Sequence, residues 1–89
     1  SSPRQYTNMP VVFRYKGYRF FFHSNEGDPR EPLHIHARKG EAVAKFWLEP
    51  YPSVAESYGM KSRELHELLD VAIENRDEIE RYWNEHFSR

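Results

Sequence analysis

The chain has 89 residues, of which 16% are aromatic and 30% charged, with no cysteine and a formal net charge of −1. This length suits one small domain, and the lack of cysteine excludes disulfides, thiolate zinc sites and a cysteine nucleophile. No apolar run is long enough to span a membrane, so we expect a cytoplasmic protein. Residues 9–89 are predicted to form a single α+β domain, and residues 1–8 a disordered leader or a remnant of expression.

Charge is distributed unevenly along the chain. Residues 1–50 carry eight Lys and Arg against five Asp and Glu, whereas residues 51–89 carry five against nine. An anionic partner should therefore meet the first half of the chain.

The first half begins with a predicted β-hairpin. Residues 11–15 and 18–23 flank Lys16-Gly17, a dipeptide that suits a two-residue turn. Pairing through this turn gathers six apolar side chains on one face: Val11, Phe13, Tyr15, Tyr18, Phe20 and Phe22. The opposite face receives Val12, Arg14, Arg19, Phe21 and His23.

A second hairpin is predicted from residues 33–38 and 41–49, which flank Lys39-Gly40. One face receives Leu33, Ile35, Ala37, Ala42, Ala44, Phe46 and Leu48. The other face receives His34, His36, Arg38, Glu41, Val43, Lys45 and Trp47. In this register Lys45 lies opposite His34.

The remainder of the chain reads as helical. Residues 53–56 have a capping-box pattern that predicts a short helical turn, which Gly59 closes. Ser62 is the predicted N-cap of a long helix with an apolar stripe, and a bend or break is expected near Asn75. The predicted fold is a two-layer α+β domain, in which a four-stranded antiparallel sheet of two hairpins is covered on one face by a C-terminal helix or bent helix pair.

Several short segments are distinctive in combination: Met9-Pro10, Tyr18 to Phe22 with Ser24-Asn25-Glu26, Arg30 to His36, Ala44 to Leu48, Arg63-Glu64-Leu65, Asn75, and Trp83-Asn84-Glu85. Together they resemble the small prokaryotic family catalogued as domain of unknown function 4160. The resemblance covers nearly all of residues 9–89 and brings no activity with it. It implies a stand-alone bacterial protein, often encoded beside another small domain in a toxin–antitoxin-like pair.

The sharpest local pattern is His34-Ile35-His36. Alternate residues of a strand point to one side, so both imidazoles can reach one metal ion or one anion. Glu41 follows at a spacing that mimics a cupin metal motif, but the chain is too short for a cupin barrel. Three interpretations stay open: packed structural histidines, contact with an anion or nucleic acid, and a divalent metal held by His34, His36 and Glu41.

The uncovered face of the sheet is the second candidate site. Its predicted binding residues are Arg14, Arg19, Phe21, His23, His34, His36, Arg38, Lys45 and Trp47. Cations for phosphate and aromatics for bases are typical of sheets that bind RNA. Exposed Trp and Arg are equally favoured where a partner protein or a second copy binds.

The leading hypothesis is a non-enzymatic interaction domain of a two-protein regulatory pair, without a cofactor. It would bind a partner encoded nearby, a second copy or an anionic ligand such as nucleic acid through the open face. The alternative is a small metal- or histidine-dependent hydrolase or nuclease centred on His34 and His36.

Overall fold

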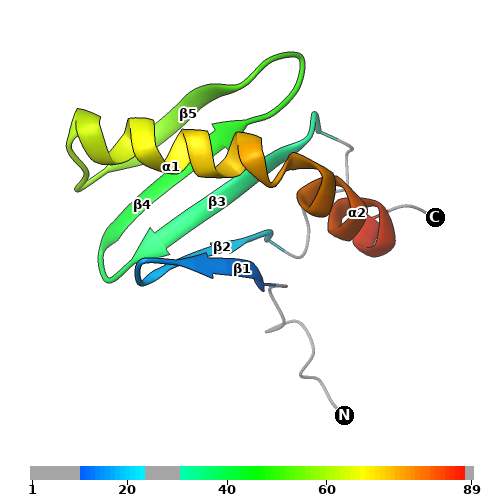
Figure 1. The fold of residues 1–89 in the computed structure, drawn as a ribbon, viewed down its shortest axis with the longest axis horizontal. Helices are drawn as coiled ribbons and strands as arrows, with labels where there is room; N and C mark the ends of the chain where they lie inside the picture. The colour runs from blue at the N-terminus through cyan, green and yellow to red at the C-terminus, as the bar shows by residue number, and fades with distance from the viewer. Residues whose placement is uncertain (1–10, 24–30, 88–89) are drawn as a thin grey trace, which may run out of the picture.

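The structure is a computed structural model that describes residues 11–23 and 31–87; the expected leader, residues 1–8, lies outside them. Five antiparallel strands, each paired with the next along the chain, form one sheet whose core-facing side carries two helices (Figure 1). The elements are β1 (Val11–Tyr15), β2 (Tyr18–Phe21), β3 (His34–Lys39), β4 (Ala42–Trp47), β5 (Ser53–Tyr58), α1 (Ser62–Glu74) and α2 (Arg76–Phe87). Neither helix has both the length and the apolar character needed to cross a membrane, as far as the described residues extend.

The first hairpin turns where the sequence predicts. Lys16 and Gly17 have φ angles of 48° and 85°, the two positive values that a tight turn between twisted strands requires. Phe13 pairs with Phe20, and their rings stack at 4.6 Å between centroids. The predicted pairing of this hairpin is therefore confirmed next to the turn.

The far end of β1 carries a β-bulge. Val11 pairs with Phe21, and Val12 is the extra residue before the pairing at Phe13. An inserted residue reverses the alternation of side chains beyond it. Val12 is consequently 6% exposed in the core and Val11 is 37% exposed, so the predicted faces of these two residues were wrong.

The second hairpin turns at Gly40-Glu41, one residue later than predicted. Gly40 has a φ of 61°, which a residue without a Cβ adopts at little cost. The register therefore differs by two residues from the predicted one, and Lys45 lies opposite His36 instead of His34. Because side chains alternate with a period of two, each residue that lies in β3 or β4 nevertheless keeps its predicted face, whereas Glu41 lies in the turn.

The fifth strand replaces the predicted helical turn at residues 53–56. β5 pairs with the outer edge of β4, so its backbone groups gain partners that an isolated helical turn would not offer. Val54 and Tyr58 are residue types that favour strands. Ala55 is an extra residue here, because Glu56 pairs with Lys45 whereas Val54 pairs with Phe46. The predicted number of four strands was wrong for this reason.

The helical layer breaks at Asn75, which confirms the predicted bent helix pair. Asn75 ends α1 with φ of −108° and ψ of 20°, and its amide Nδ2 donates a hydrogen bond to the Val71 carbonyl oxygen at 2.8 Å. The start of α1 differs by one residue from the prediction, because Lys61 and not Ser62 is the N-cap. The Lys61 backbone N–H donates to Glu64 Oε1 at 2.9 Å.

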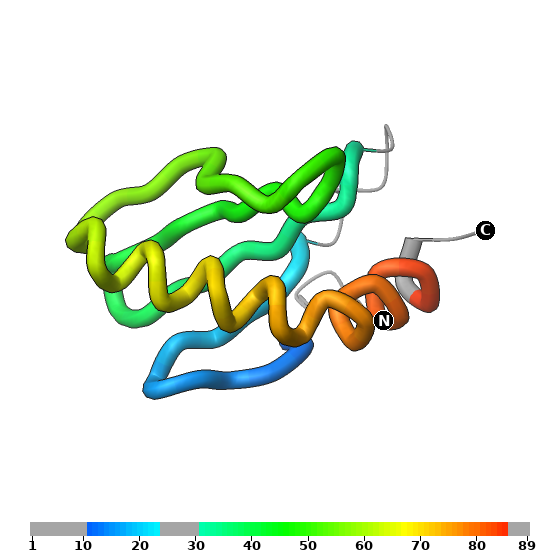
Figure 2. The backbone as a smooth tube through the Cα atoms, turned by 45° about the horizontal axis from the view of Figure 1, so that its top comes forward, coloured from blue at the N-terminus to red at the C-terminus, as the bar shows by residue number. Residues whose placement is uncertain are grey.

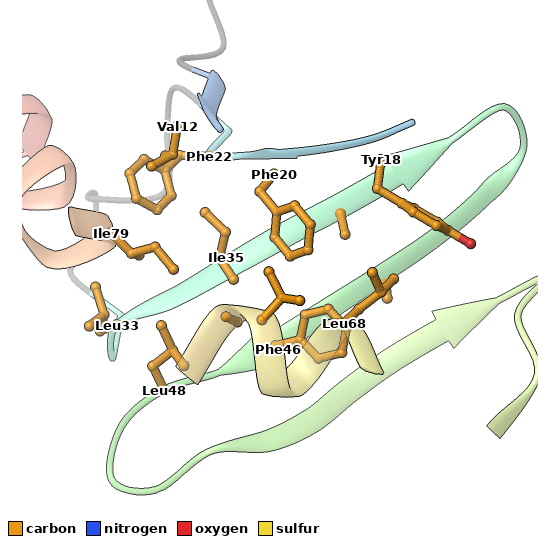
Figure 3. Packing of buried hydrophobic residues seen from close by; sticks show 14 of the residues in the cluster. Val12, Tyr18, Phe20, Phe22, Leu33, Ile35, Phe46, Leu48, Leu68 and Ile79 are labelled. Carbon is orange, nitrogen blue, oxygen red and sulfur yellow. The ribbon is translucent and has the colours of Figure 1, made fainter. Parts of the chain in front are cut away.

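The core lies between the helices and one face of the sheet. Phe20, Ile35 and Phe46 from three neighbouring strands pack against Leu68 of α1, while Ile79 of α2 closes the end of the layer (Figure 3). The tube in Figure 2 shows α1 running over the sheet before the chain bends into α2. Burial of each such side chain stabilises the fold by about 1.5–3 kcal/mol.

The apolar stripe that the sequence predicts for α1 includes Ile73 and leaves out Val71, and the structure reverses both assignments. Val71 is buried in the core, whereas Ile73 is 42% exposed. The helical layer thus covers one sheet face and leaves the other uncovered, as the two-layer prediction requires.

Candidate functional site

Strand pairing aligns three arginines across the uncovered face. Arg14 of β1 lies opposite Arg19 of β2, and Arg19 lies opposite Arg38 of β3. All three side chains are exposed. We call this set the arginine row. Residues directly opposite in a sheet have Cβ atoms about 4.5–5.5 Å apart, and like charges placed so destabilise the pairing.

The arginine row has no acidic partner among the residues that the structure describes. Among the side chains that the structure describes, none of the ion pairs involves Arg14, Arg19 or Arg38. Arg38 donates a hydrogen bond from Nε to the backbone carbonyl of Gly40 at 2.9 Å, which orients the guanidinium without neutralising its charge. The row is therefore suited to an external anion.

A hollow of about 410 Å³ lies beside the arginine row on the same face. Besides Arg38, the aromatic, histidine and charged side chains that line it come from β2 to β5 and from the residue pair after β2: Phe21, His23, His36, Lys45, Glu56 and Tyr58. Arg38 belongs both to the lining and to the row. Aromatic and imidazole rings, two cations and one carboxylate therefore line the same hollow.

His36 is the centre of the ring contacts in this region. Its ring centroid lies 4.2 Å from that of His23, 5.2 Å from that of His34 and 5.6 Å from that of Phe21. His36 is half-buried and His23 is exposed, so this part of the cluster faces the hollow. The sequence-predicted residues His23, His36 and Phe21 are therefore brought together.

His34 lies deeper than its place on the strand suggests. Pairing of β2 with β3 ends at Phe21, and beyond this point Trp83 of α2 comes within 5.2 Å of the His34 ring. The centre of the Trp47 ring lies 5.3 Å from that of His34. The Nδ1 atom of His34 lies 2.9 Å from the carbonyl oxygen of Pro32. His34 is fully buried, so it is not part of the accessible face.

Lys45 separates the hollow from Trp47. Its ammonium lies 3.5 Å from Glu31 Oε1 and 4.4 Å from the centre of the Trp47 ring, and its side chain is 18% exposed. Trp47 is half-buried and does not line the hollow. The indole that the sequence suggested as an exposed anchor therefore has one face covered by a cation.

Glu41 lies apart from His34 and His36, the other two residues predicted as metal ligands. Glu41 is in the turn at the far end of the hairpin, beyond Lys39, which itself lies about 10 Å along the strand from His36 at 3.3 Å per residue. Over the described residues, no three His, Cys, Asp or Glu side chains form a group that could hold a metal. His34 and His36 thus contact each other without a third ligand from Glu41.

Glu56 and Tyr58 of β5 line the hollow, but the sequence did not predict them as site residues. Both belong to the segment predicted as a helical turn, and Tyr58 is 68% exposed. The signal that points to a strand is the pair Val54 and Tyr58 following the prolines at 50 and 52.

A polar contact fixes the hairpin that carries Arg14 and Arg19 to the helical layer. The Tyr15 hydroxyl donates to Glu67 Oε2 of α1, and Lys16 Nζ lies 3.0 Å from the same oxygen. These hydrogen bonds hold the pKa of Glu67 below its ordinary value, and the same bonds to Glu67 raise the pKa of Tyr15 and of Lys16. We call these three residues the Glu67 clamp.

The fold and the face define a small α+β domain that buries one side of its sheet under helices and presents a basic, ring-lined surface on the other. The chain belongs to the family described as domain of unknown function DUF4160, whose family model matches residues 17–84. No curated protein and no solved structure matches the sequence.

Proposed function

We propose that the protein is a non-enzymatic binding domain that takes an anionic partner on its open sheet face. The arginine row carries this proposal, because Arg14, Arg19 and Arg38 are adjacent in register and lack ion-pair partners among the described side chains. Folding brings their charges together at a cost in repulsion. An anion bridging the guanidiniums would offset that cost through charge-assisted, bidentate hydrogen bonds.

The charge of the helical layer supports the same direction of binding. α1 and α2 together carry eight Asp and Glu against three Arg. The fields of the two layers therefore differ in sign, which steers an approaching anion toward the sheet. The hollow of about 410 Å³ lies within the range of ordinary ligand sites, about 300–1,000 Å³.

The biological setting that we propose is a two-protein, toxin–antitoxin-like regulatory pair in the cytoplasm of a bacterium. This setting follows from the resemblance stated above, and the product of the adjacent gene is the partner protein to test first, before a second copy. A hydrolase centred on His34 and His36 is not proposed, since the fully buried His34 offers no access to a substrate.

Retention on an anionic resin at pH 7 tests the proposed function. The protein should bind phosphocellulose at low salt despite its net charge of −1, because the arginine row gathers positive charge on one face. Arg19→Glu, which reverses the central charge of the row, should elute at distinctly lower salt. The matched control is Arg63→Glu, the same change at an exposed residue of α1.

The control should elute with the parent protein. Passage of the parent protein through the resin without retention would contradict the proposal. So would an equal loss of retention in both variants, because retention would then follow net charge and not the open face.

A further inference from the structure

We infer that the anionic partner is a single-stranded nucleic acid, with phosphates along the arginine row and one unpaired base in the hollow. This inference rests on the proposed function and names the class of ligand. It is carried by what lines the hollow beside the arginines, since the arginines alone suit any anion.

Four of the side chains that line the hollow carry rings. Phe21, His23 and His36 lie on one side and Tyr58 on the other, across the width of the sheet. Tyr58 is 68% exposed, so its ring is available to a ligand. Stacking on such rings suits every base, because every base has a π-face. An acidic peptide has no corresponding use for a ring-lined hollow.

The polar groups of the hollow also favour a base over a carboxylate-rich chain. Glu56 of β5 lies directly opposite Lys45 of β4, and both line the hollow. The edge of a base carries hydrogen-bond donors and acceptors together, which match a carboxylate next to an ammonium. The carboxylates of an acidic peptide would be repelled by Glu56 if the peptide entered the hollow.

The arrangement further selects single strands over duplexes. Arg38 belongs to the row and to the lining of the hollow, so a phosphate on Arg38 places its own nucleotide beside the rings. A base can enter the hollow only when it is not stacked inside a helix. A duplex can therefore use the arginine row but leaves the hollow empty.

The first experiment is fluorescence anisotropy with a labelled 12-nucleotide single strand of mixed sequence, as RNA and as DNA, from low to moderate salt. Three phosphates held by three arginines predict a slope of log K against log salt of about −2, at about −0.7 per contact. Arg19→Glu should bind more weakly and with a shallower slope. Arg63→Glu should bind as the parent does.

The second experiment separates the base from the phosphate. Tyr58→Ala should weaken binding of the single strand about tenfold through the loss of one stacking contact. Its matched control is Tyr51→Ala, because Tyr51 is equally exposed, at 67%, and lies outside the hollow. An abasic strand of the same length should bind the parent protein about as weakly as the intact strand binds Tyr58→Ala.

The outcomes distinguish this inference from the function on which it rests. Equal affinity for intact and abasic strands, tighter binding of duplex, or preference for a poly-glutamate peptide would overturn the nucleic-acid assignment. In each of those cases the proposed anion-binding function stands, provided that Arg19→Glu still weakens binding. If strand, duplex and peptide all fail to bind at low salt, the proposed function fails together with the inference.

Discussion

His34 fills the end of the sheet where β2 and β3 separate. Its imidazole lies between the rings of Trp47 and Trp83, and its Nδ1 lies 2.9 Å from the Pro32 carbonyl oxygen. Contacts of this kind join the open side of the sheet to α2, because Trp83 also meets Phe22 in the core at 5.2 Å. His34 therefore contributes to stability, whereas His36, two residues further along the strand, lines the hollow.

Replacing His34 by alanine tests this division of roles. The variant should lose about 2–5 kcal/mol of unfolding free energy in urea titrations, as expected when a buried side chain is truncated to alanine. His36→Ala, at a half-buried position in the hollow, should lose clearly less. The reverse order of the two losses would show that the cluster is held by His36.

At the scale of elements, the first hairpin depends on α1 for part of its position. Tyr15 and Lys16 next to its turn share the carboxylate of Glu67. The charged form of Glu67 is the favoured partner, since hydrogen bonds from both residues lower its pKa from the ordinary value of 4.5. The position of Arg14 and Arg19 on the sheet is thereby linked to the protonation of one helical residue.

The Glu67 clamp predicts a defined dependence of stability on pH. A carboxyl group whose pKa is lower in the folded than in the unfolded protein stabilises the fold at any pH above its unfolded-state pKa. This stabilisation is lost as the pH falls through the folded-state pKa. Glu67→Gln should therefore melt at a lower temperature than the parent at pH 7, and the difference should shrink as the pH falls below the ordinary carboxyl pKa of 4.5.

Thermal melts of both proteins across this range provide the measurement. Glu74→Gln, an exposed change at the end of the same helix, is the control and should leave the pH dependence of the parent intact. A constant difference between Glu67→Gln and the parent at all pH values would show that the carboxylate charge plays no part.

The elements also show how far the sequence determines this fold. Alternation in the two hairpins assigns most residues to the correct face, because a two-residue error in register does not change the face. The bulge at Val12 and the strand at 53–58 escaped prediction, since both depend on which backbone groups a neighbouring strand leaves to be paired. Local patterns show at most a preference for strand, as at Val54 and Tyr58, and do not show which neighbouring strand a segment pairs with.

The candidate site was predictable to a similar degree. The arginines and Phe21 follow from alternation alone. Burial of His34 depends on Trp83, which is 49 positions further along the chain and belongs to another layer. Glu56 and Tyr58 enter the site only through the fifth strand, so the hollow could not be recognised before the strand was.

At the scale of the whole molecule, folding itself creates the concentration of positive charge. Arg38 is 19 positions beyond Arg19 in the sequence, and only folding places Arg14, Arg19 and Arg38 side by side in the sheet. A polyanion that needs all three therefore binds the native state and not the unfolded state. Such a ligand must raise the stability of the native protein.

Tripolyphosphate should accordingly raise the melting temperature more than sodium chloride does at equal ionic strength. At a concentration ten times its dissociation constant the gain is about 1.4 kcal/mol, which corresponds to a rise of roughly 5–10 °C for a domain of this size. Arg19→Glu should lose most of this rise, and Arg63→Glu should keep it. An identical response to both salts would mean that the row holds no anion.

The irregular pairing in β1 and β5 has a consequence for how the protein behaves when crowded. These two strands form the margins of the sheet, and each contains one residue without a counterpart, Val12 and Ala55. A bulge twists an edge strand, so that its free amide and carbonyl groups no longer match the hydrogen-bonding groups of an incoming strand. Templated addition of further chains, the route to fibrils, is thus disfavoured at both margins, and we expect concentrated samples to resist fibril growth.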